Sequence, residues 1–249
     1  MKLCIVQARM SSTRFPGKVL KEINHKTMLE LLLFRISGSV MIDELIVVIS
    51  KNKSDDVLAE YLSKKKVKYF RGSEEDVLDR FYQAVRYFEM TPDCIIRLTA
   101  DCPLHHAEVV DFAVSEFYKS NLDYFSNSNQ PPVLEDGCDT EVFTWVALQD
   151  SWKNSTKKSE REHVTPYIKN SGNNRCAYKK YSADYNFKLS VDNENDFKTV
   201  SGIFNSFYPD ELFSVSEMII MLNKHPELLN PNSSSIINEG YRKSLESEE

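Results

Sequence analysis

The sequence contains little glycine, and its seven glycines among 249 residues form none of the familiar phosphate-binding loops. Neither the Gly-x-x-x-x-Gly-Lys loop nor the Gly-x-Gly-x-x-Gly fingerprint of dinucleotide-binding folds is present. If the protein holds phosphate groups, we expect it to use side-chain cations, helix termini and a metal ion instead. Only nine prolines accompany the seven glycines, which excludes a collagen-like or low-complexity chain.

Long apolar runs are also missing, since no stretch approaches the roughly 20 residues that a membrane-spanning helix needs. The first apolar segment runs directly into Gln7 and Arg9, which makes it too short for the core of a signal peptide. The five cysteines are scattered without Cys-x-x-Cys spacing, which argues against a zinc site and is typical of reduced thiols. We therefore expect a cytoplasmic protein without a membrane partner.

The charge balance excludes another class of partner. A formal net charge of −6 argues against a duplex nucleic-acid binder, whose surface is usually basic. It does not argue against a small anionic ligand, because local groups of cations can lie on an acidic protein. The length suits one large domain with a sizeable core.

Short apolar segments alternate with helical patterns through the first half of the chain. The predicted strands cover residues 3–8, 44–50, 67–70 and 93–99. The predicted helices cover residues 28–40, a segment from 54 onward, 77–88 and 107–118. Because strands separated by helices pair in parallel, this alternation predicts an α/β fold with a mostly parallel central sheet.

After about residue 122 the alternation fades. Residues 126–136 are rich in Asn, Ser and Pro and predict a loop, followed by shorter elements at 139–143, 145–152 and 175–180. We interpret 122–185 as an excursion beside the sheet, within a single domain that covers 1–230. Two helices, at 192–207 and 214–223, complete this domain, and the polar composition of 231–249 predicts a loosely held tail.

A cation-rich loop follows the first predicted strand. Arg9, Arg14 and Lys18 lie within ten residues, interleaved with hydroxyl side chains and closed by Pro16-Gly17. Open α/β sheets bind ligands beyond the carboxyl ends of their strands, so these cations suit a triphosphate. The alternative is an ordinary solvated loop.

Two aspartates occupy comparable positions later in the chain. Asp101 comes directly after an apolar strand and Asp192 after a short one, where hard oxygen donors would hold a phosphate-bound Mg²⁺. The alternative for each is a helix N-cap. Asp196 is expected in the first turn of the following helix, where it would complement the helix dipole.

Three further segments offer polar groups. Arg71 and Ser73 end the third strand and could meet a base, whereas the next residues, Glu74 to Arg80, suit ion pairs on a helix surface. The segments 136–141 and 159–167 suit recognition of a second anion, the acceptor, although a turn or a structural histidine would explain them too. His105 and His106 are expected on a helix surface.

In five places, and in the same order, the sequence resembles the cytidylyltransferases of the CMP-Kdo and CMP-acylneuraminate synthetase group. The strongest likeness is to the branch called spore coat polysaccharide biosynthesis protein SpsF. The resemblance covers residues 1–230 and is carried by residues 6–20, 70–80, 99–104, 159–167 and 191–192. Phe15 replaces the leucine usual in the opening motif, and the sugar-acid specificity motifs do not match clearly.

The resemblance implies a Rossmann-like nucleotide-diphospho-sugar transferase sandwich of the GT-A type that uses CTP and Mg²⁺. It implies a homodimer, with the excursion at the interface. The implied nucleotide-binding residues are Ala8, Arg9, Arg14, Lys18, Arg71, Ser73 and Thr99, of which Arg9 and Lys18 would be catalytic together with Asp101. The implied metal ligands are Asp101 and Asp192. The implied acceptor-binding residues are Asp136, Asp139, Glu141, Arg161, His163 and Tyr167.

The sequence thus predicts a Mg²⁺-dependent cytidylyltransferase that transfers CMP from CTP to a sugar-acid, phosphorylated or phosphonate acceptor, for surface polysaccharide biosynthesis. The alternative is a glycosyltransferase that uses a nucleotide-sugar donor. Such enzymes commonly carry an Asp-x-Asp metal motif, and the corresponding place here holds Asp101 alone. A third possibility is a nucleotide-binding protein without catalytic activity.

Overall fold

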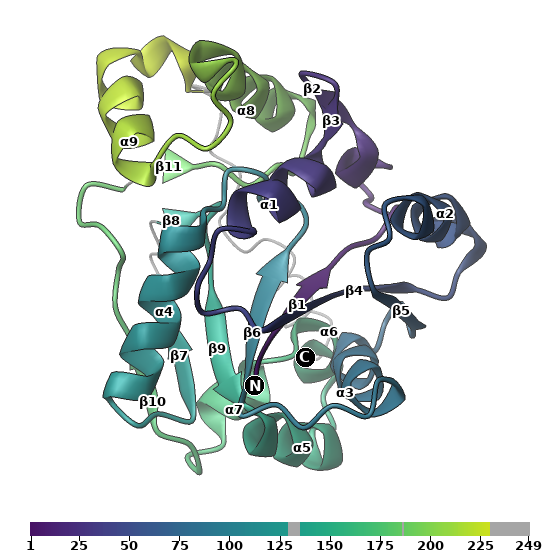
Figure 1. Cartoon of the computed structure of the whole chain (residues 1–249). Helices are drawn as coiled ribbons and strands as arrows, with labels where there is room; N and C mark the ends of the chain where they lie inside the picture. The colour runs from purple at the N-terminus through teal and green to yellow at the C-terminus, as the bar shows by residue number, and fades with distance from the viewer. Residues whose placement is uncertain (129–134, 186, 230–249) are drawn as a thin grey trace.

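The structure is a computed structural model that describes residues 1–128, 135–185 and 187–229. A seven-stranded sheet with the order β10-β7-β9-β6-β1-β4-β5 forms its centre (Figure 1). The strands are β1 (Lys2–Gln7), β4 (Glu44–Ser50), β5 (Tyr69–Gly72), β6 (Cys94–Thr99), β7 (Tyr124–Ser126), β9 (Glu141–Thr144) and β10 (Cys176–Tyr178). Strand β9 is antiparallel to β6 and β7, and the other pairs are parallel. The predicted α/β fold with a mostly parallel sheet is confirmed.

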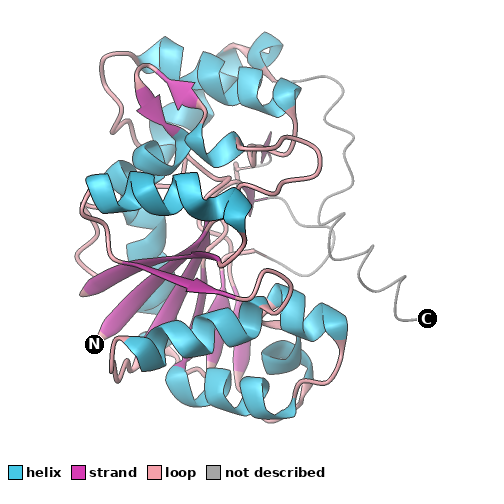
Figure 2. Ribbon diagram, turned by 90° about the vertical axis from the view of Figure 1, so that its right-hand side faces the viewer, coloured by secondary structure: helices cyan, strands magenta, loops and turns pink. Residues whose placement is uncertain are grey.

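Helices cover both faces of the sheet (Figure 2). The covering helices are α1 (Met28–Ile36), α2 (Asp56–Lys64), α3 (Val77–Tyr87), α4 (Ala107–Lys119), α5 (Trp145–Asn154), α6 (Lys158–His163) and α7 (Pro166–Asn170). Within β1, Cys4 and Val6 point to the side of α1, α2 and α4. Leu3 and Ile5 point to the side of α3 and α5. Both faces of the strand are therefore apolar, as is usual in a sheet buried on two sides.

A third apolar cluster joins α8 (Glu194–Phe207) and α9 (Val215–Lys224) to α1 and to the segment before α4. The guanidinium of Arg35 in α1, which is fully buried, fixes this junction. It donates hydrogen bonds to the main-chain carbonyls of Leu104, His105, Glu211 and Phe213. Short two-stranded pairs, β2 (Glu22–Ile23) with β3 (Lys26–Thr27) and β8 (Glu135–Asp136) with β11 (Phe187–Lys188), lie around the sheet.

Residues 122–185 differ from expectation, because β7, β9 and β10 join the main sheet instead of lying beside it. These strands have only three or four residues each, too few for a clear alternation of apolar and polar positions. Residues 129–134 of the predicted loop, and the predicted tail at 231–249, lie outside the described residues.

The two helix-cap alternatives for the aspartates are wrong. Helix α4 begins after an N-cap at His106, and α8 begins after an N-cap at Asn193. Asp196 lies in the first turn of α8, as predicted, and closes its capping box. The expectation of a surface position for His105 is also wrong: its ring is fully buried and lies 2.9 Å from the Thr140 hydroxyl, because a turn at residues 102–105 delays the start of α4.

Candidate active site

A cleft with a cavity volume of about 890 Å³ lies at the carboxyl ends of β1 and β6. This is the edge of the sheet at which α/β folds bind ligands. The cleft collects residues from the first loop, from the ends of β6 and β9, and from the segments before α7 and α8. Of the predicted site residues it is lined by Ala8, Arg9, Arg14, Lys18, Thr99, Asp101, Asp136, Asp139, Glu141, His163 and Asp192.

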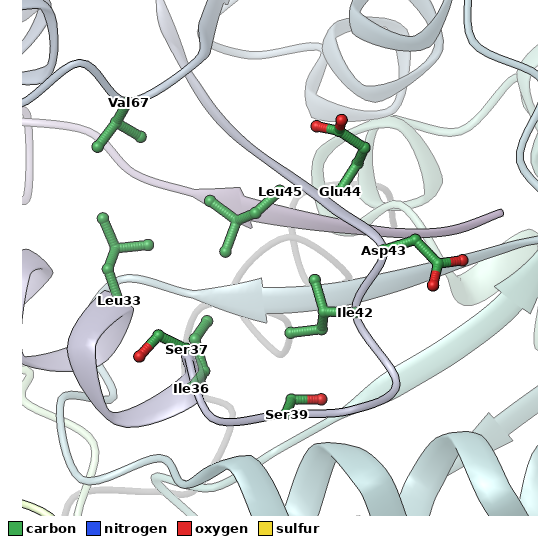
Figure 3. A pocket seen from close by; sticks show the side chains of 9 residues that line it. All are labelled: Leu33, Ile36, Ser37, Ser39, Ile42, Asp43, Glu44, Leu45 and Val67. Carbon is green, nitrogen blue, oxygen red and sulfur yellow. The ribbon is translucent and has the colours of Figure 1, made fainter.

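A second hollow, of about 370 Å³, lies between α1 and β4 (Figure 3). Its lining is apolar apart from two serines and two acidic residues, Asp43 and Glu44. No lysine or arginine lines it, so it offers no cation to a phosphate group. The larger cleft is therefore the candidate site for a phosphate-bearing ligand.

The first loop is held in place by backbone geometry and by one buried carboxylate. Gly17 has a φ of 72°, a left-handed conformation that favours glycine, and its N–H donates to the Met10 carbonyl at 2.9 Å. Asp55 is fully buried and accepts hydrogen bonds from the N–H groups of Met10 and Ser50, both at 2.8 Å. The loop is thus closed on itself and anchored to β4, whereas the sequence pattern placed Asp55 only at the start of a helix.

Lys18 lies between the two predicted metal ligands. Its ammonium donates to Asp101 Oδ2 at 2.8 Å and to the Val191 carbonyl at 2.6 Å, and it lies 3.8 Å from Asp192 Oδ1. Arg14 reaches the same Asp192 oxygen at 2.9 Å. Burial alone would raise the pKa of Asp101, but the charge of Lys18 outweighs it and lowers the pKa to about 2. The carboxylate is therefore ionised at neutral pH.

A second set of charged groups, Lys188 and Asp196, orients Asp192. Its N–H donates to Asp196 Oδ2 at 2.9 Å. The buried ammonium of Lys188 lies 3.0 Å from the same Asp196 oxygen and 3.3 Å from Asp192 Oδ2. Lys188, which the sequence analysis did not single out, therefore fixes which oxygen Asp192 presents to the cleft.

Asp101 and Asp192 fit a divalent cation only if a bound ligand and water supply its other oxygen atoms. Asp101 and Asp192 come from different elements, yet each has an oxygen within 4 Å of the same ammonium, so both already face one cationic centre. Among the described residues no group of three or more His, Cys, Asp or Glu side chains could hold a metal ion. A Mg²⁺ ion bound there would complete its six oxygens with phosphate and water.

Across the cleft, Glu141 is the centre of a buried polar network. It forms an ion pair with Arg97 and accepts hydrogen bonds from the hydroxyls of Tyr124 at 2.5 Å and Thr165 at 2.7 Å. Lys169 lies 3.8 Å away. Burial raises the pKa of Glu141, but Arg97 and Lys169 outweigh it and bring the pKa to about 2. Neither cation was predicted from the sequence, since Arg97 lies within an apolar strand.

His163 lines the same side of the cleft. Burial is the main cause that lowers its pKa, to about 4, so its imidazole is neutral at pH 7. A neutral imidazole can offer a hydrogen bond to a bound acceptor without adding charge.

Two carboxyl groups face the cleft from a tight turn that begins at Asp136. Gly137 has a φ of 107°, and a Cβ atom there would lie 2.6 Å from the Leu189 carbonyl carbon, so the turn requires glycine. Asp136 accepts the Ser190 N–H at 3.0 Å. Burial, followed by the charge of Asp136, raises the pKa of Asp139 to about 8.

We expect Asp139→Asn to stabilise the protein increasingly as the pH rises. A carboxyl group with a raised pKa binds its proton more tightly in the folded state, so the wild type loses stability between about pH 4 and pH 8. Asparagine cannot ionise, so the difference in Tm between variant and wild type should grow from pH 5 to pH 9. Thermal denaturation measures it, with the exposed Asp184→Asn as control. A difference that stays constant with pH would contradict the expectation.

Four predicted site residues do not line the cleft: Arg71, Ser73, Arg161 and Tyr167. The Arg71 guanidinium donates to the carbonyls of Ser50 and Asn52 at 3.1 and 2.9 Å and pairs with Asp56. Ser73 accepts the Asp76 N–H at 3.1 Å. The side chains of Arg71 and Ser73 are thus both held by neighbouring protein groups.

Arg161 binds Asp76 through two guanidinium nitrogens, with contacts of 2.6–3.0 Å, and so ties α6 to the start of α3. Arg80 itself forms no ion pair with the described residues, so the expectation of a helix-surface pair is wrong for this residue. Its side chain is 2% exposed and lines the cleft.

A sequence profile described as Cytidylyltransferase matches residues 3–226 of this chain. Two relatives match nearly the whole chain. One is the uncharacterised protein MJ1063 of Methanocaldococcus jannaschii, 36% identical over 96% of both chains. The other is the spore coat polysaccharide biosynthesis protein SpsF of Bacillus subtilis, 30% identical over 90% of this chain and 95% of SpsF.

Solved structures show the same fold. A cytidylyltransferase from Leptospira borgpetersenii superimposes with a TM-score of 0.84 at 28% identity, covering 93% of this chain and 97% of that chain. A CMP:2-keto-3-deoxy-manno-octonic acid synthetase solved in complex with CTP gives a TM-score of 0.63 at 14% identity, covering 83% and 99%. This second likeness concerns the fold alone.

Proposed function

The chain belongs to the cytidylyltransferase family and is a CTP-dependent nucleotidyltransferase, and from this premise we propose which residues carry the reaction and what the acceptor is. The proposal is a Mg²⁺-dependent transfer of CMP from CTP to a small anionic acceptor, with release of pyrophosphate. The observation that supports it best is the position of Lys18 between Asp101 and Asp192 at the carboxyl ends of the first and central strands.

In the proposed reaction the acceptor oxygen attacks the α-phosphorus of CTP. A new oxygen–phosphorus bond forms while the bond from the α-phosphorus to the bridging oxygen breaks, and pyrophosphate leaves with that electron pair. Arg9, Arg14 and Lys18 neutralise the charge that develops on the leaving group. Asp101 and Asp192 would hold Mg²⁺, which would supply further neutralisation of the phosphates. Positioning of the two substrates provides most of the remaining rate.

The side of the cleft around Glu141 receives the acceptor in this proposal. Arg97 and Lys169 supply two cations on this side, beside the carboxylates of Glu141 and Glu162, and would meet an anionic group of the acceptor. A sugar acid, a phosphorylated compound or a phosphonate satisfies that requirement. The name of the SpsF relative supports a role in surface polysaccharide biosynthesis.

We further propose that the enzyme works in the cytoplasm as a homodimer. Among the described helices, none has the length and apolar character needed to cross a bilayer. Sedimentation of the purified protein tests the assembly directly, and a single species with the mass of one chain would contradict it.

The proposal predicts pyrophosphate release that depends on CTP, Mg²⁺ and acceptor together. The assay offers each of the four nucleoside triphosphates with a panel of sugar acids, phospho-sugars, phosphonates and phospho-amino acids. We expect release with CTP at least about 100-fold faster than with UTP, since a site that hydrogen-bonds a base rejects analogues with mismatched groups. Omission of Mg²⁺ should abolish the release.

Two other outcomes would replace the proposal. Release of a nucleoside diphosphate from a nucleotide-sugar donor would identify a glycosyltransferase. CTP binding without pyrophosphate release across the whole panel would identify a nucleotide-binding protein without this activity.

A further inference from the structure

Arg80 is a buried cation that lacks a counter-charge. It lies in the first turn of α3, 2% exposed, and its aliphatic part packs against Gly72, where a Cβ atom would lie 2.8 Å from Arg80 Cγ. The one hydrogen bond of its guanidinium to the described residues runs from Nη1 to the Ser73 carbonyl, and Nε has no partner there. No carboxylate of the described residues lies within 4 Å of the guanidinium.

The two acids whose charges act on Arg80, Asp55 and Glu74, are already engaged elsewhere. Asp55 uses its two oxygens to accept the N–H groups of Met10 and Ser50. Glu74 accepts hydrogen bonds from Ser11 and Asn52 through its two oxygens. Burial and the neighbouring charge of Arg9 lower the pKa of Arg80 to about 10, so it is still charged at neutral pH. An uncompensated buried charge is costly, which makes an external anion the natural partner.

The cleft provides the place where that anion would bind. Arg80 and Arg9 both line it, beside Ala8 at the end of β1. Arg9 is exposed and forms no ion pair with the described residues. By contrast, Arg14 and Lys18 are already paired with Asp192 and Asp101. On the side of the first loop the cleft therefore holds Arg14 and Lys18, which are paired with carboxylates, and Arg9 and Arg80, which form no ion pair with the described residues.

We propose that Arg80, which lines the cleft, binds a phosphate group of the nucleotide and of the pyrophosphate product together with Arg9. This inference rests on the proposed function for the identity of the anion. It assigns Arg80 a direct contact with substrate, in place of the surface ion pair that its sequence context suggested.

The test compares Arg80→Met and Arg80→Lys with Arg86→Met, an exposed arginine on the same helix. Calorimetry measures the binding of CTP, inorganic pyrophosphate and cytidine to each protein. We expect Arg80→Met to weaken CTP and pyrophosphate binding roughly 30-fold, the effect of losing a charge-assisted hydrogen bond, with cytidine unchanged. Arg80→Lys should fall in between, since lysine keeps the charge but not the planar donor edge.

Thermal denaturation keeps the test independent of folding defects. The ligand-free Tm of Arg80→Met should equal or exceed that of the wild type, because a buried unpaired charge is removed, while the rise in Tm on adding CTP should shrink. Unchanged pyrophosphate binding in Arg80→Met, or loss of cytidine binding instead, would overturn the inference alone. A wild type that binds neither CTP nor pyrophosphate would overturn the proposed function as well.

Discussion

Asp101→Asn is expected to lower kcat/KM for CTP about 100-fold, or roughly 3 kcal/mol of transition-state stabilisation, without unfolding the protein. Asparagine has the same shape, so the turn after β6 should keep its geometry, but its side chain offers no charge to Mg²⁺. The ionised state of Asp101 at neutral pH is maintained by Lys18 at 2.8 Å, so the wild type contributes a full negative charge. The initial rate of pyrophosphate release, measured as a function of CTP concentration, gives kcat/KM for both proteins.

The metal dependence of Asp101→Asn separates this role from a general disturbance of the cleft. The Mg²⁺ concentration needed for half-maximal activity should rise, whereas binding of metal-free CTP should change little or become tighter, because one negative charge facing the phosphates is gone. Asp184→Asn, an exposed aspartate outside the cleft, is the matched control. Near-normal activity of Asp101→Asn with an unchanged Mg²⁺ requirement would show that the assignment of this aspartate is wrong.

The predicted cations and carboxylates line one cleft, and for three of them the sheet supplies the reason. Arg14, Lys18 and Asp101 follow β1 and β6, two parallel strands whose carboxyl ends lie at one edge of the sheet. Asp192 follows β11, which lies outside the main sheet, so the strand pattern does not explain how it reaches the same cleft. The order of strands and helices in the first half of the chain was predicted correctly from the alternation of apolar segments with helical patterns. Strands of six or seven residues with an apolar centre, such as β4, are long enough to be predicted without tertiary information.

The sequence pattern did not predict roles that depend on which face of a helix or strand a residue occupies. Arg80 lies three residues after Val77 and four before Ala84, both buried, so helical spacing places it on the inner face of α3. That signal was available, but the neighbouring acids suggested surface ion pairs instead. Lys188 and Asp55 act on the site through carboxylates and main-chain groups that only the folded chain brings together.

Arg71 was expected at the nucleotide, but its side chain does not line the cleft. Its position at the end of β5 matches the family motif, yet its guanidinium is held by the carbonyls of Ser50 and Asn52 and by Asp56. A motif fixes where a residue lies along a strand, but hydrogen-bonding groups from other segments decide where a long, flexible side chain points. For arginine, with several rotatable bonds and five donors, that competition is strongest.

Lys18→Met should have the largest effect on catalysis, a loss of roughly 1,000-fold in kcat/KM, since it removes a phosphate-binding charge and the cation between Asp101 and Asp192. Asp101 would then face Asp192 without its lysine partner, while Arg14 and Lys188 would still pair with Asp192, so the variant should also lose about 2 kcal/mol in the free energy of unfolding. The double variant Lys18→Met/Asp101→Asn separates these roles: removing one of the two charges should restore most of the stability but none of the activity. Urea denaturation and pyrophosphate release report the two quantities, with the exposed Lys21→Met as control. If the double variant recovers activity along with stability, Lys18 serves only to hold the fold together.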